Sequence, residues 1–204
     1  MSTPSLAARC GHGVTSPRLT AITGGIGAGK SVVSAILTAM GYPVYDCDSR
    51  AKALMDADTE IHVALCRLIH PRCVIDGVID RPLISSIVFA DAAKLQQLNG
   101  IVHAAVRADL AEWRIANASA PRLFVETAIL TESALHTIVD DVWEVVAPQQ
   151  LRISRVMARN NIPAEAVKAR IAAQRPLPAD LPNLIHQLHN DNLHPLLPQI
   201  EALL

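Results

Sequence analysis

The chain has 204 residues, of which 50% are hydrophobic and 18% charged, and its formal net charge is −1. This length suits one α/β domain with small insertions, and the hydrophobic content argues against disorder in the body of the chain. The near-neutral charge and the six dispersed aromatic residues argue against a nucleic-acid surface, and no apolar run is long enough to cross a membrane.

Residues 1–17 differ from the rest of the chain. They are rich in Ser, Thr and Gly and contain Arg9 as their only Lys or Arg. We therefore expect a disordered leader, followed by a folded domain over residues 18–204. The four cysteines contain no CxxC pair, which favours reduced thiols and a cytoplasmic protein.

The folded part begins with a strand, a glycine-rich loop and a helix. Leu19–Thr23 is a short apolar run, and Val32–Met40 has helical spacing that ends at Gly41. Between them, Gly24 to Ser31 satisfies the pattern G-x-x-x-x-G-K-[ST]. Pro43–Tyr45 is expected to be a second strand, ending at Asp46-Cys47-Asp48.

The glycine-rich loop predicts nucleoside-triphosphate binding. Glycines let successive backbone N–H groups point at phosphate oxygens, and the helix N-terminus adds its positive dipole end. Lys30 supplies a charge for the β- and γ-phosphates, and the Ser31 hydroxyl is a direct Mg²⁺ ligand. The expected ATP-binding residues are Gly25, Ile26, Gly27, Ala28, Gly29, Lys30, Ser31 and Val32.

The next segment, residues 49–118, is expected to be an inserted helical subdomain that binds the acceptor. Ser49–Met55 and Thr59–Ile69 look helical, and Asp76-Gly77 is typical of a hairpin turn. Asp80 before Arg81-Pro82 suits a helix start, and Asp91 precedes a long amphipathic pattern from Ala92 to about Ala116.

The remaining elements complete an open sheet. Arg122–Glu126 and Val142–Ala147 are apolar runs typical of buried parallel strands, and Leu184–Leu188 is a possible fifth strand. The other elements expected here are helices at Gln149–Asn160, Ala164–Arg175 and Leu196–Leu204. This order predicts a three-layer α-β-α P-loop NTPase fold with a five-stranded, mainly parallel sheet and a short helical lid over residues 149–176.

The absence of two motifs argues against two classes of P-loop protein. The chain has neither the N-K-x-D motif of GTPases nor the L-S-G-G-Q signature of ABC-type ATPases. An insertion after the second strand and an arginine-bearing helical pair after the fourth favour a small-molecule kinase. The alternatives are another small-metabolite or nucleotide kinase, or a nucleotide-binding module without turnover.

Further motifs resemble those of the dephospho-CoA kinase family over nearly the whole chain from Leu19. They include Thr23 to Ser31, the run Val44-Tyr45-Asp46-Cys47-Asp48, the D-G-x-x-D-R pattern at 76–81, the L-N-x-I-x-H pattern at 98–103, R-x-x-x-R at 155–159 and R-I-x-x-Q at 170–174. Ala104 and Ala128 stand where the family usually has proline.

The resemblance implies transfer of the ATP γ-phosphate to the ribose 3′-hydroxyl of dephospho-CoA, the last step of coenzyme A biosynthesis. It implies ATP and dephospho-CoA as partners and Mg²⁺ as cofactor, and we expect a monomer. It places the general base at Asp48, which also lies just past the carboxyl end of the second strand, where ligands bind in open α/β sheets. It places Arg81 and His103 on the acceptor side.

The spacing of other charged residues adds candidates beside structural alternatives. Arg155 and Arg159 lie on one helical face and would share the ATP phosphates as catalytic cations, although both could belong to a solvated surface. Glu126 could hold a Mg²⁺-bound water, or it could cap a helix or form a salt bridge. Asp48 could cap the helix expected at Ser49, and Asp46 would share its face of an extended chain.

Overall fold

The computed structural model describes residues 16–181 and 184–204. Most of the expected leader, residues 1–15, therefore lies outside the described residues. Within the described part of the chain, no helix is both long enough and apolar enough to span a membrane.

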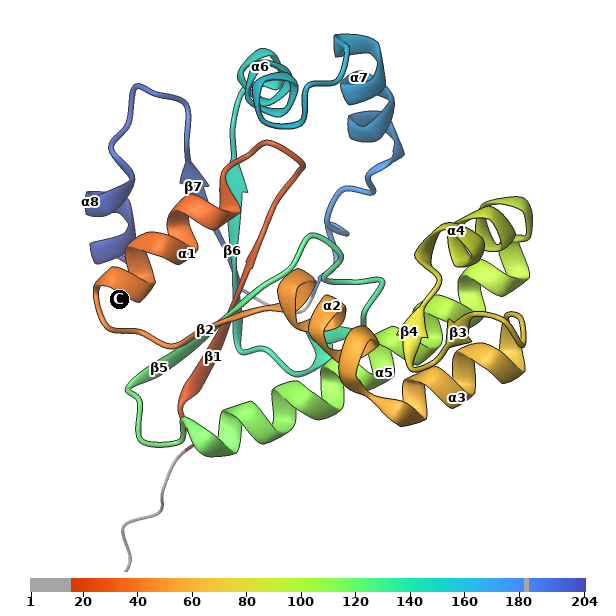
Figure 1. Ribbon diagram of the computed structural model, residues 1–204. Coiled ribbons are helices and arrows are strands. Elements are labelled where there is room, and N and C mark those ends of the chain that lie inside the picture. Colours follow the sequence, from red (N-terminus) through yellow and green to blue (C-terminus); the bar gives the residue numbers. More distant parts are fainter. Residues whose placement is uncertain (1–15, 182–183) are drawn as a thin grey trace, which may run out of the picture.

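The centre of the fold is a five-stranded sheet in the order β2-β5-β1-β6-β7, and all its neighbouring strands are parallel (Figure 1). Its strands are β1 (Arg18–Thr23), β2 (Val44–Asp46), β5 (Arg122–Glu126), β6 (Asp141–Val146) and β7 (Leu184–His189). The strand and helix order confirms the expected three-layer α/β fold. The placement of β1 between β5 and β6 brings the glycine-rich loop to the middle of the sheet's carboxyl edge, where ligands bind in folds of this kind.

Eight α-helices and a short 3-10 helix are found among the described residues. They are α1 (Lys30–Ala39), α2 (Cys47–Ala57), α3 (Thr59–Leu68), α4 (Arg81–Ala90), α5 (Ala92–Ala116), η1 (Leu135–Thr137), α6 (Gln149–Asn160), α7 (Ala164–Ala173) and α8 (Leu196–Glu201).

Two apolar clusters cover the two faces of the sheet. On one face, α1 and α8 pack against Phe124, Trp143 and Leu188, all of which are fully buried. On the other face, α2 and α5 pack against Leu123 and Val142. Burial on both faces explains why β5 and β6 are continuous apolar runs in the sequence instead of alternating ones.

Between β2 and β5 the chain forms α2 to α5 and a small hairpin. The hairpin joins β3 (Val74–Ile75) to β4 (Val78–Ile79) through Asp76 and Gly77, which both have positive φ. Helices α3 and α4 pack on the far part of α5 around a separate apolar cluster that includes Leu65 and Val88. This part projects to the side of the sheet in Figure 1, and α6 and α7 lie beyond the carboxyl ends of the strands.

Candidate active site

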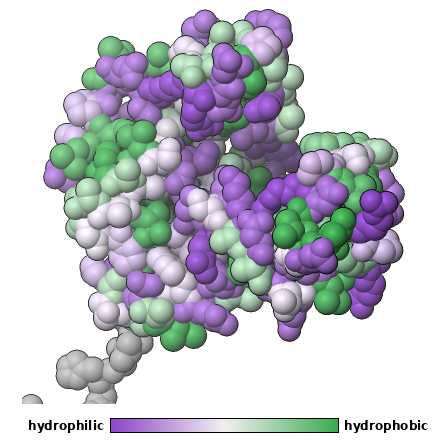
Figure 2. Space-filling model, viewed as in Figure 1, coloured by the Kyte–Doolittle hydropathy of each residue, from purple (hydrophilic) through white to green (hydrophobic). Residues whose placement is uncertain are grey.

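A cleft of about 570 Å³ brings most of the expected site residues together. Its lining residues are Ile26, Gly27, Gly29, Lys30, Ser31, Val32, Asp46, Asp48, Ser49, Lys52, Glu126, Ala128, Arg155, Val156, Arg159 and Gln174. Figure 2 shows the surface hollowed between the α6–α7 pair and the α3–α4 region, with hydrophilic residues on the walls. Two of the expected ATP-binding residues, Gly25 and Ala28, are not among the residues that line this cleft.

The glycines of the loop are needed for close packing within the protein as well as for access to phosphate. A Cβ atom on Gly24, where φ is 140°, would lie 2.3 Å from the carbonyl oxygen of Val145 on β6. At Gly27, where φ is 76°, it would lie 2.6 Å from the carbonyl oxygen of Arg152 on α6. The loop is therefore wedged between β6 and α6.

The backbone amides of the loop divide into free and paired groups. The N–H groups that have no acceptor among the described residues include those of Gly27, Gly29, Lys30 and Ser31. The N–H of Ala28 donates to the Gly25 carbonyl at 3.0 Å, and that of Ile26 donates to Gln174 Oε1 at 2.6 Å. The free amides all belong to residues that line the cleft, so they form a cradle for an anion.

Lys30 lies at the start of α1 inside the cleft. Its Nζ donates to the Gly24 carbonyl at 3.0 Å, which folds the side chain back along the loop. Burial lowers the pKa of Lys30, and the carboxylates of Glu126 and Asp48 partly offset that effect. A desolvated cation held beside free amides is suited to a phosphate group.

Asp46 ends β2 and Asp48 lies two residues further along, and the local structure around them differs from the expected extended chain. Helix α2 begins at Cys47 because Asp46 caps it, accepting from the backbone N–H of Asp48 at 3.0 Å and of Ser49 at 3.2 Å. The idea that Asp46 and Asp48 share one face of an extended chain is therefore wrong, as is the alternative that Asp48 is the cap. Asp48 is exposed to the cleft in the first turn of α2, and its carboxylate has no hydrogen-bond partner among the described residues.

Glu126 ends β5 next to the loop strand and is half-buried in the cleft. Burial raises the pKa of Glu126, and Asp46 and Asp48 raise it further. The nearby Ser34 hydroxyl and Lys30 act in the opposite direction and favour the carboxylate. The cleft is thus lined by three acidic residues, and Glu126 and Asp48 both act on the charge of the half-buried Lys30.

Arg155 and Arg159 both line the cleft from α6. Arg155 is held by the loop after β7, where it donates to the Asn190 carbonyl at 3.0 Å and to Asn192 Oδ1 at 2.8 Å. Arg159 is exposed and donates to Asn160 Oδ1 at 3.0 Å. Neither guanidinium forms an ion pair with a described carboxylate, which leaves both charges available to an anion in the cleft.

A second cavity, of about 220 Å³, adjoins the cleft at Asp48. Its other lining residues are Cys47, Ala51, Asn99, Val102, His103, Val106, Arg107, Thr127, Ile129, Ser133 and Leu135. Burial and the Arg107 cation lower the pKa of His103, so this imidazole is neutral near pH 7. Arg81 lines neither cavity; it pairs with Asp56 at 2.6 Å on the surface.

The sequence reasoning did not select three polar residues of the cleft region: Lys52, Arg152 and Gln174. Lys52 follows Asp48 by four residues on α2, and Arg152 precedes Arg155 by three on α6, so helical spacing could have found both. Gln174 is the last residue of the R-I-x-x-Q pattern at 170–174, which assigns it no contact of its own. Its contact with Ile26 joins residues 148 positions apart, which no local pattern reveals.

The oxygen donors of the cleft suit Mg²⁺. A hydroxyl and carboxylates, from Ser31, Asp46, Asp48 and Glu126, are the hard ligands that this ion prefers. No group of three or more His, Cys, Asp or Glu residues able to hold a metal exists among the described residues. Mg²⁺ commonly keeps several waters and takes other ligands from substrate phosphates, so a site with few protein ligands fits its chemistry.

Comparison with known proteins gives a consistent picture. A family model for dephospho-CoA kinase matches residues 18–193. A dephospho-CoA kinase from Porphyromonas gingivalis is 38% identical over 180 residues, which are 88% of this chain and 89% of the relative. One from Thermus thermophilus is 36% identical over 167 residues, 81% of this chain and 79% of the relative.

Solved structures share the same architecture. The crystal structure of TT1252 from Thermus thermophilus has a TM-score of 0.75 and 34% identity, covering 93% of this chain and 95% of that one. The dephospho-CoA kinase from Campylobacter jejuni, at 22% identity and a TM-score of 0.59, has the same fold, with 90% of this chain and 92% of that one covered.

Proposed function

Because the chain belongs to the dephospho-CoA kinase family, we propose that it transfers the γ-phosphate of ATP to the ribose 3′-hydroxyl of dephospho-CoA, giving coenzyme A and ADP. The observation that carries this proposal is the cleft in which free loop amides and Lys30 face the unpartnered carboxylate of Asp48. A triphosphate on the amides and an alcohol at Asp48 would meet within one cavity.

The phosphate side follows from the charges in the cleft. The amides of Gly27, Gly29, Lys30 and Ser31 would bind phosphate oxygens, and the Lys30 ammonium would stabilise the charge that develops on the transferred group. From α6, Arg155 and Arg159 would contact the same oxygens as the lid closes and excludes water. Alignment and charge stabilisation are the main work in phosphoryl transfer.

The acceptor side is assigned to Asp48 and the adjoining cavity. The Asp48 carboxylate would accept the proton of the attacking hydroxyl, and neutral His103 could donate or accept a hydrogen bond with the rest of the acceptor. Arg81 remains a candidate for the diphosphate of the acceptor, and it would have to leave Asp56 or share it.

For Mg²⁺, the proposed direct ligand is the Ser31 hydroxyl, and Glu126 would hold a metal-bound water. The ion, when bound, would neutralise phosphate charge. The raised pKa of Glu126 means that its carboxylate is more easily protonated in the folded protein than an exposed one. A bound metal ion would act in the opposite direction, because a neighbouring cation favours the charged form of a carboxyl group.

Three further features belong to the same proposal. Residues 49–118 would bind the acceptor, and residues 149–176 would act as the lid. We propose a cytoplasmic monomer; the three described cysteines, Cys47, Cys66 and Cys73, are free thiols, which suits a reducing compartment.

An acceptor panel tests the proposal. ADP release is measured with Mg²⁺-ATP and dephospho-CoA, AMP, gluconate or no acceptor, with Lys30→Ala run in parallel to reveal contaminating kinases. Of these acceptors, we expect only dephospho-CoA to support ADP release. Phosphorus NMR of the product should place the new phosphate on the ribose 3′ position. Turnover with AMP or gluconate instead would favour another metabolite kinase, and nucleotide binding without turnover would favour a binding module.

A further inference from the structure

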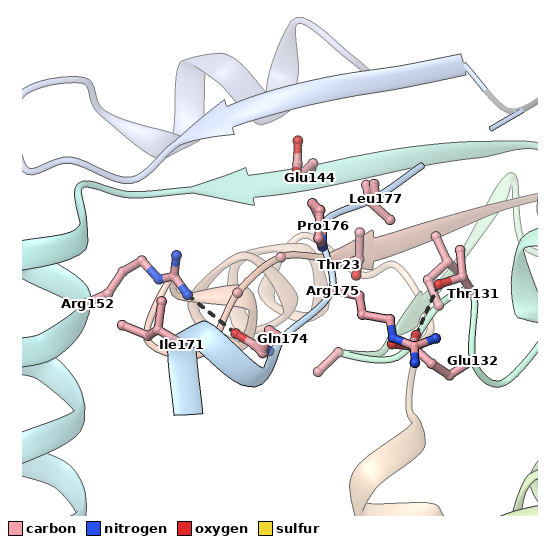
Figure 3. Close-up of a pocket in the computed structure, with 14 residues that line it drawn as sticks. Thr23, Thr131, Glu132, Glu144, Arg152, Ile171, Gln174, Arg175, Pro176 and Leu177 are labelled. Carbon is pink, nitrogen blue, oxygen red and sulfur yellow. Dashed lines mark hydrogen bonds between the residues drawn. The ribbon is translucent and has the colours of Figure 1, made fainter. Parts of the chain in front are cut away.

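Two lid residues hold the two consecutive peptide groups that meet at Ile26, at the tip of the phosphate loop. The N–H of Ile26 donates to Gln174 Oε1 at 2.6 Å, and the carbonyl of Ile26 accepts from Arg152 Nε at 2.9 Å. Arg152 also donates to Gln174 Oε1 at 3.3 Å, which closes a triangle of hydrogen bonds. Figure 3 shows Arg152 reaching from α6 toward Gln174 at the end of α7.

Because peptide groups are planar, these contacts also fix the direction of the neighbouring Gly27 N–H in the cradle. In a trans peptide the carbonyl of one residue and the N–H of the next point in opposite directions. The peptide bond between Ile26 and Gly27 is trans. By fixing the Ile26 carbonyl, Arg152 therefore aims the Gly27 N–H away from its own guanidinium, and Gly27 lines the cleft.

The preceding peptide is fixed in the same way. Gln174 holds the Ile26 N–H, so the Gly25 carbonyl points the other way, where it accepts from the Ala28 N–H at 3.0 Å. The Arg152 guanidinium can pack against residue 25 only because this residue is glycine. A Cβ atom on Gly25 would lie 2.2 Å from the guanidinium. Both peptides of the tip are thus set by residues of the lid.

We propose that Arg152 and Gln174 are positioning residues that hold the two peptide groups on either side of Ile26 and so link the lid helices to the geometry of the phosphate cradle. The inference rests on the placement of ATP in the cleft proposed above. Neither side chain needs to touch the nucleotide, since they act through the loop. Because α6 supplies one and the end of α7 the other, a movement of either helix is transmitted to the Gly27 amide.

The test measures ADP affinity and amide exchange in the full-length protein, and ADP binding does not depend on the acceptor. Gln174→Met keeps the side-chain length and removes the acceptor oxygen. We expect faster hydrogen exchange at the Ile26 amide and about fivefold weaker ADP binding, the effect of losing one ordinary hydrogen bond. Gln174→Glu keeps an acceptor oxygen, so it should keep the Ile26 amide protected.

A second variant tests the geometry of the arginine. Arg152→Lys keeps the charge but loses the planar fork that serves Ile26 and Gln174 together, so we expect a raised KM for ATP. Gln97→Met, on the exposed face of α5, is the matched control for Gln174→Met. It should change neither the ADP affinity nor the hydrogen exchange of the Ile26 amide. Circular dichroism and Tm confirm that each variant is folded.

Three outcomes would overturn the proposal. Tighter ADP binding in Gln174→Met would mean that Gln174 competes with phosphate for the Ile26 amide. Unchanged exchange and affinity would mean that the contact is incidental. Wild-type KM in Arg152→Lys would mean that charge alone matters. If dephospho-CoA proved not to be the acceptor, these nucleotide measurements would still stand.

Discussion

Glu126 and Lys30 face each other in the cleft, and burial acts on both. It raises the pKa of the carboxyl group and lowers the pKa of the ammonium group, so the charged form of each residue is costly in the folded protein. Such a pair is poorly explained by stability. It is well explained by a site that has to present a cation to phosphate and an oxygen ligand to a metal.

The raised pKa of Glu126 gives a prediction about stability. Below pH 4.5, the ordinary value, the carboxyl group is protonated in both folded and unfolded protein. As pH rises through 4.5 toward the higher folded value, the unfolded chain loses its proton first, so the free energy of unfolding falls. Glu126→Gln should therefore raise Tm at pH 8 in metal-free buffer, and the gain should shrink as pH approaches 4.

Differential scanning calorimetry of both proteins from pH 4 to 8 checks this expectation, with ADP release measured alongside. The same variant should lose activity, because a neutral amide holds a metal-bound water less strongly than a carboxylate does. A variant that is less stable than the wild type at pH 8 would show that Glu126 is held in a favourable structural ion pair instead.

At the scale of elements, the glycine-rich loop is fixed by its neighbours. Gly24 meets the backbone of β6, whereas Gly25 meets only the end of the Arg152 side chain. A backbone cannot move aside cheaply, but a long side chain can adopt another rotamer. The structure therefore requires glycine strictly at position 24 and less strictly at position 25. The sequence alone does not distinguish these two positions.

Alanine substitutions separate these requirements. Gly24→Ala should destabilise the protein by about 2–3 kcal/mol, because a Cβ would clash with the Val145 carbonyl and φ is 140°. Gly25→Ala should cost less than about 1 kcal/mol while displacing Arg152 and raising the KM for ATP. Urea unfolding and steady-state kinetics measure the two effects, and equal destabilisation by both variants would contradict this view of the loop.

Local chemistry made several elements predictable from the sequence. Asp80 and Asp91 cap α4 and α5 as expected, and Asp76-Gly77 forms the expected hairpin turn. The start of α2 was misplaced by two residues because Asp46 was assigned to a strand face, although an aspartate two residues after a strand start is equally able to cap a helix. The hydrogen bonds of Arg152 and Gln174 were out of reach, since they depend on how α6 and α7 pack on the loop.

In the molecule as a whole, one end of the sheet carries the candidate active site and the other carries a buried hydrogen-bond and ion-pair network. The cleft lies at the carboxyl ends of the strands, while Arg122 and Asp141, near the opposite ends, form a buried ion pair at 2.5 Å. Arg122 also donates to Thr20 Oγ1 at 2.8 Å and to the Leu203 carbonyl at 2.7 Å. This network ties β1, β5, β6 and the chain end together without touching the site.

Removing this arginine should therefore affect stability and leave the chemistry intact. Arg122→Met leaves the Asp141 carboxylate buried with less compensation, and we expect a loss of about 3–5 kcal/mol. Below its lowered Tm, the variant should keep KM values for ATP and acceptor within about twofold of wild type. Chemical denaturation and kinetics at 15 °C check both parts, and a large change in KM in the folded variant would show that the two ends are coupled.

In the proposed reaction, the Asp48 carboxylate takes the proton of an alcohol that attacks a triphosphate held on the loop amides. The most direct test is kcat for Asp48→Asn with dephospho-CoA, together with ADP affinity. If Asp48 is the general base, kcat should fall by roughly 10²- to 10⁴-fold, the usual contribution of such a base, with ADP affinity close to wild type. A folded variant that loses less than fivefold in kcat would contradict this role of Asp48.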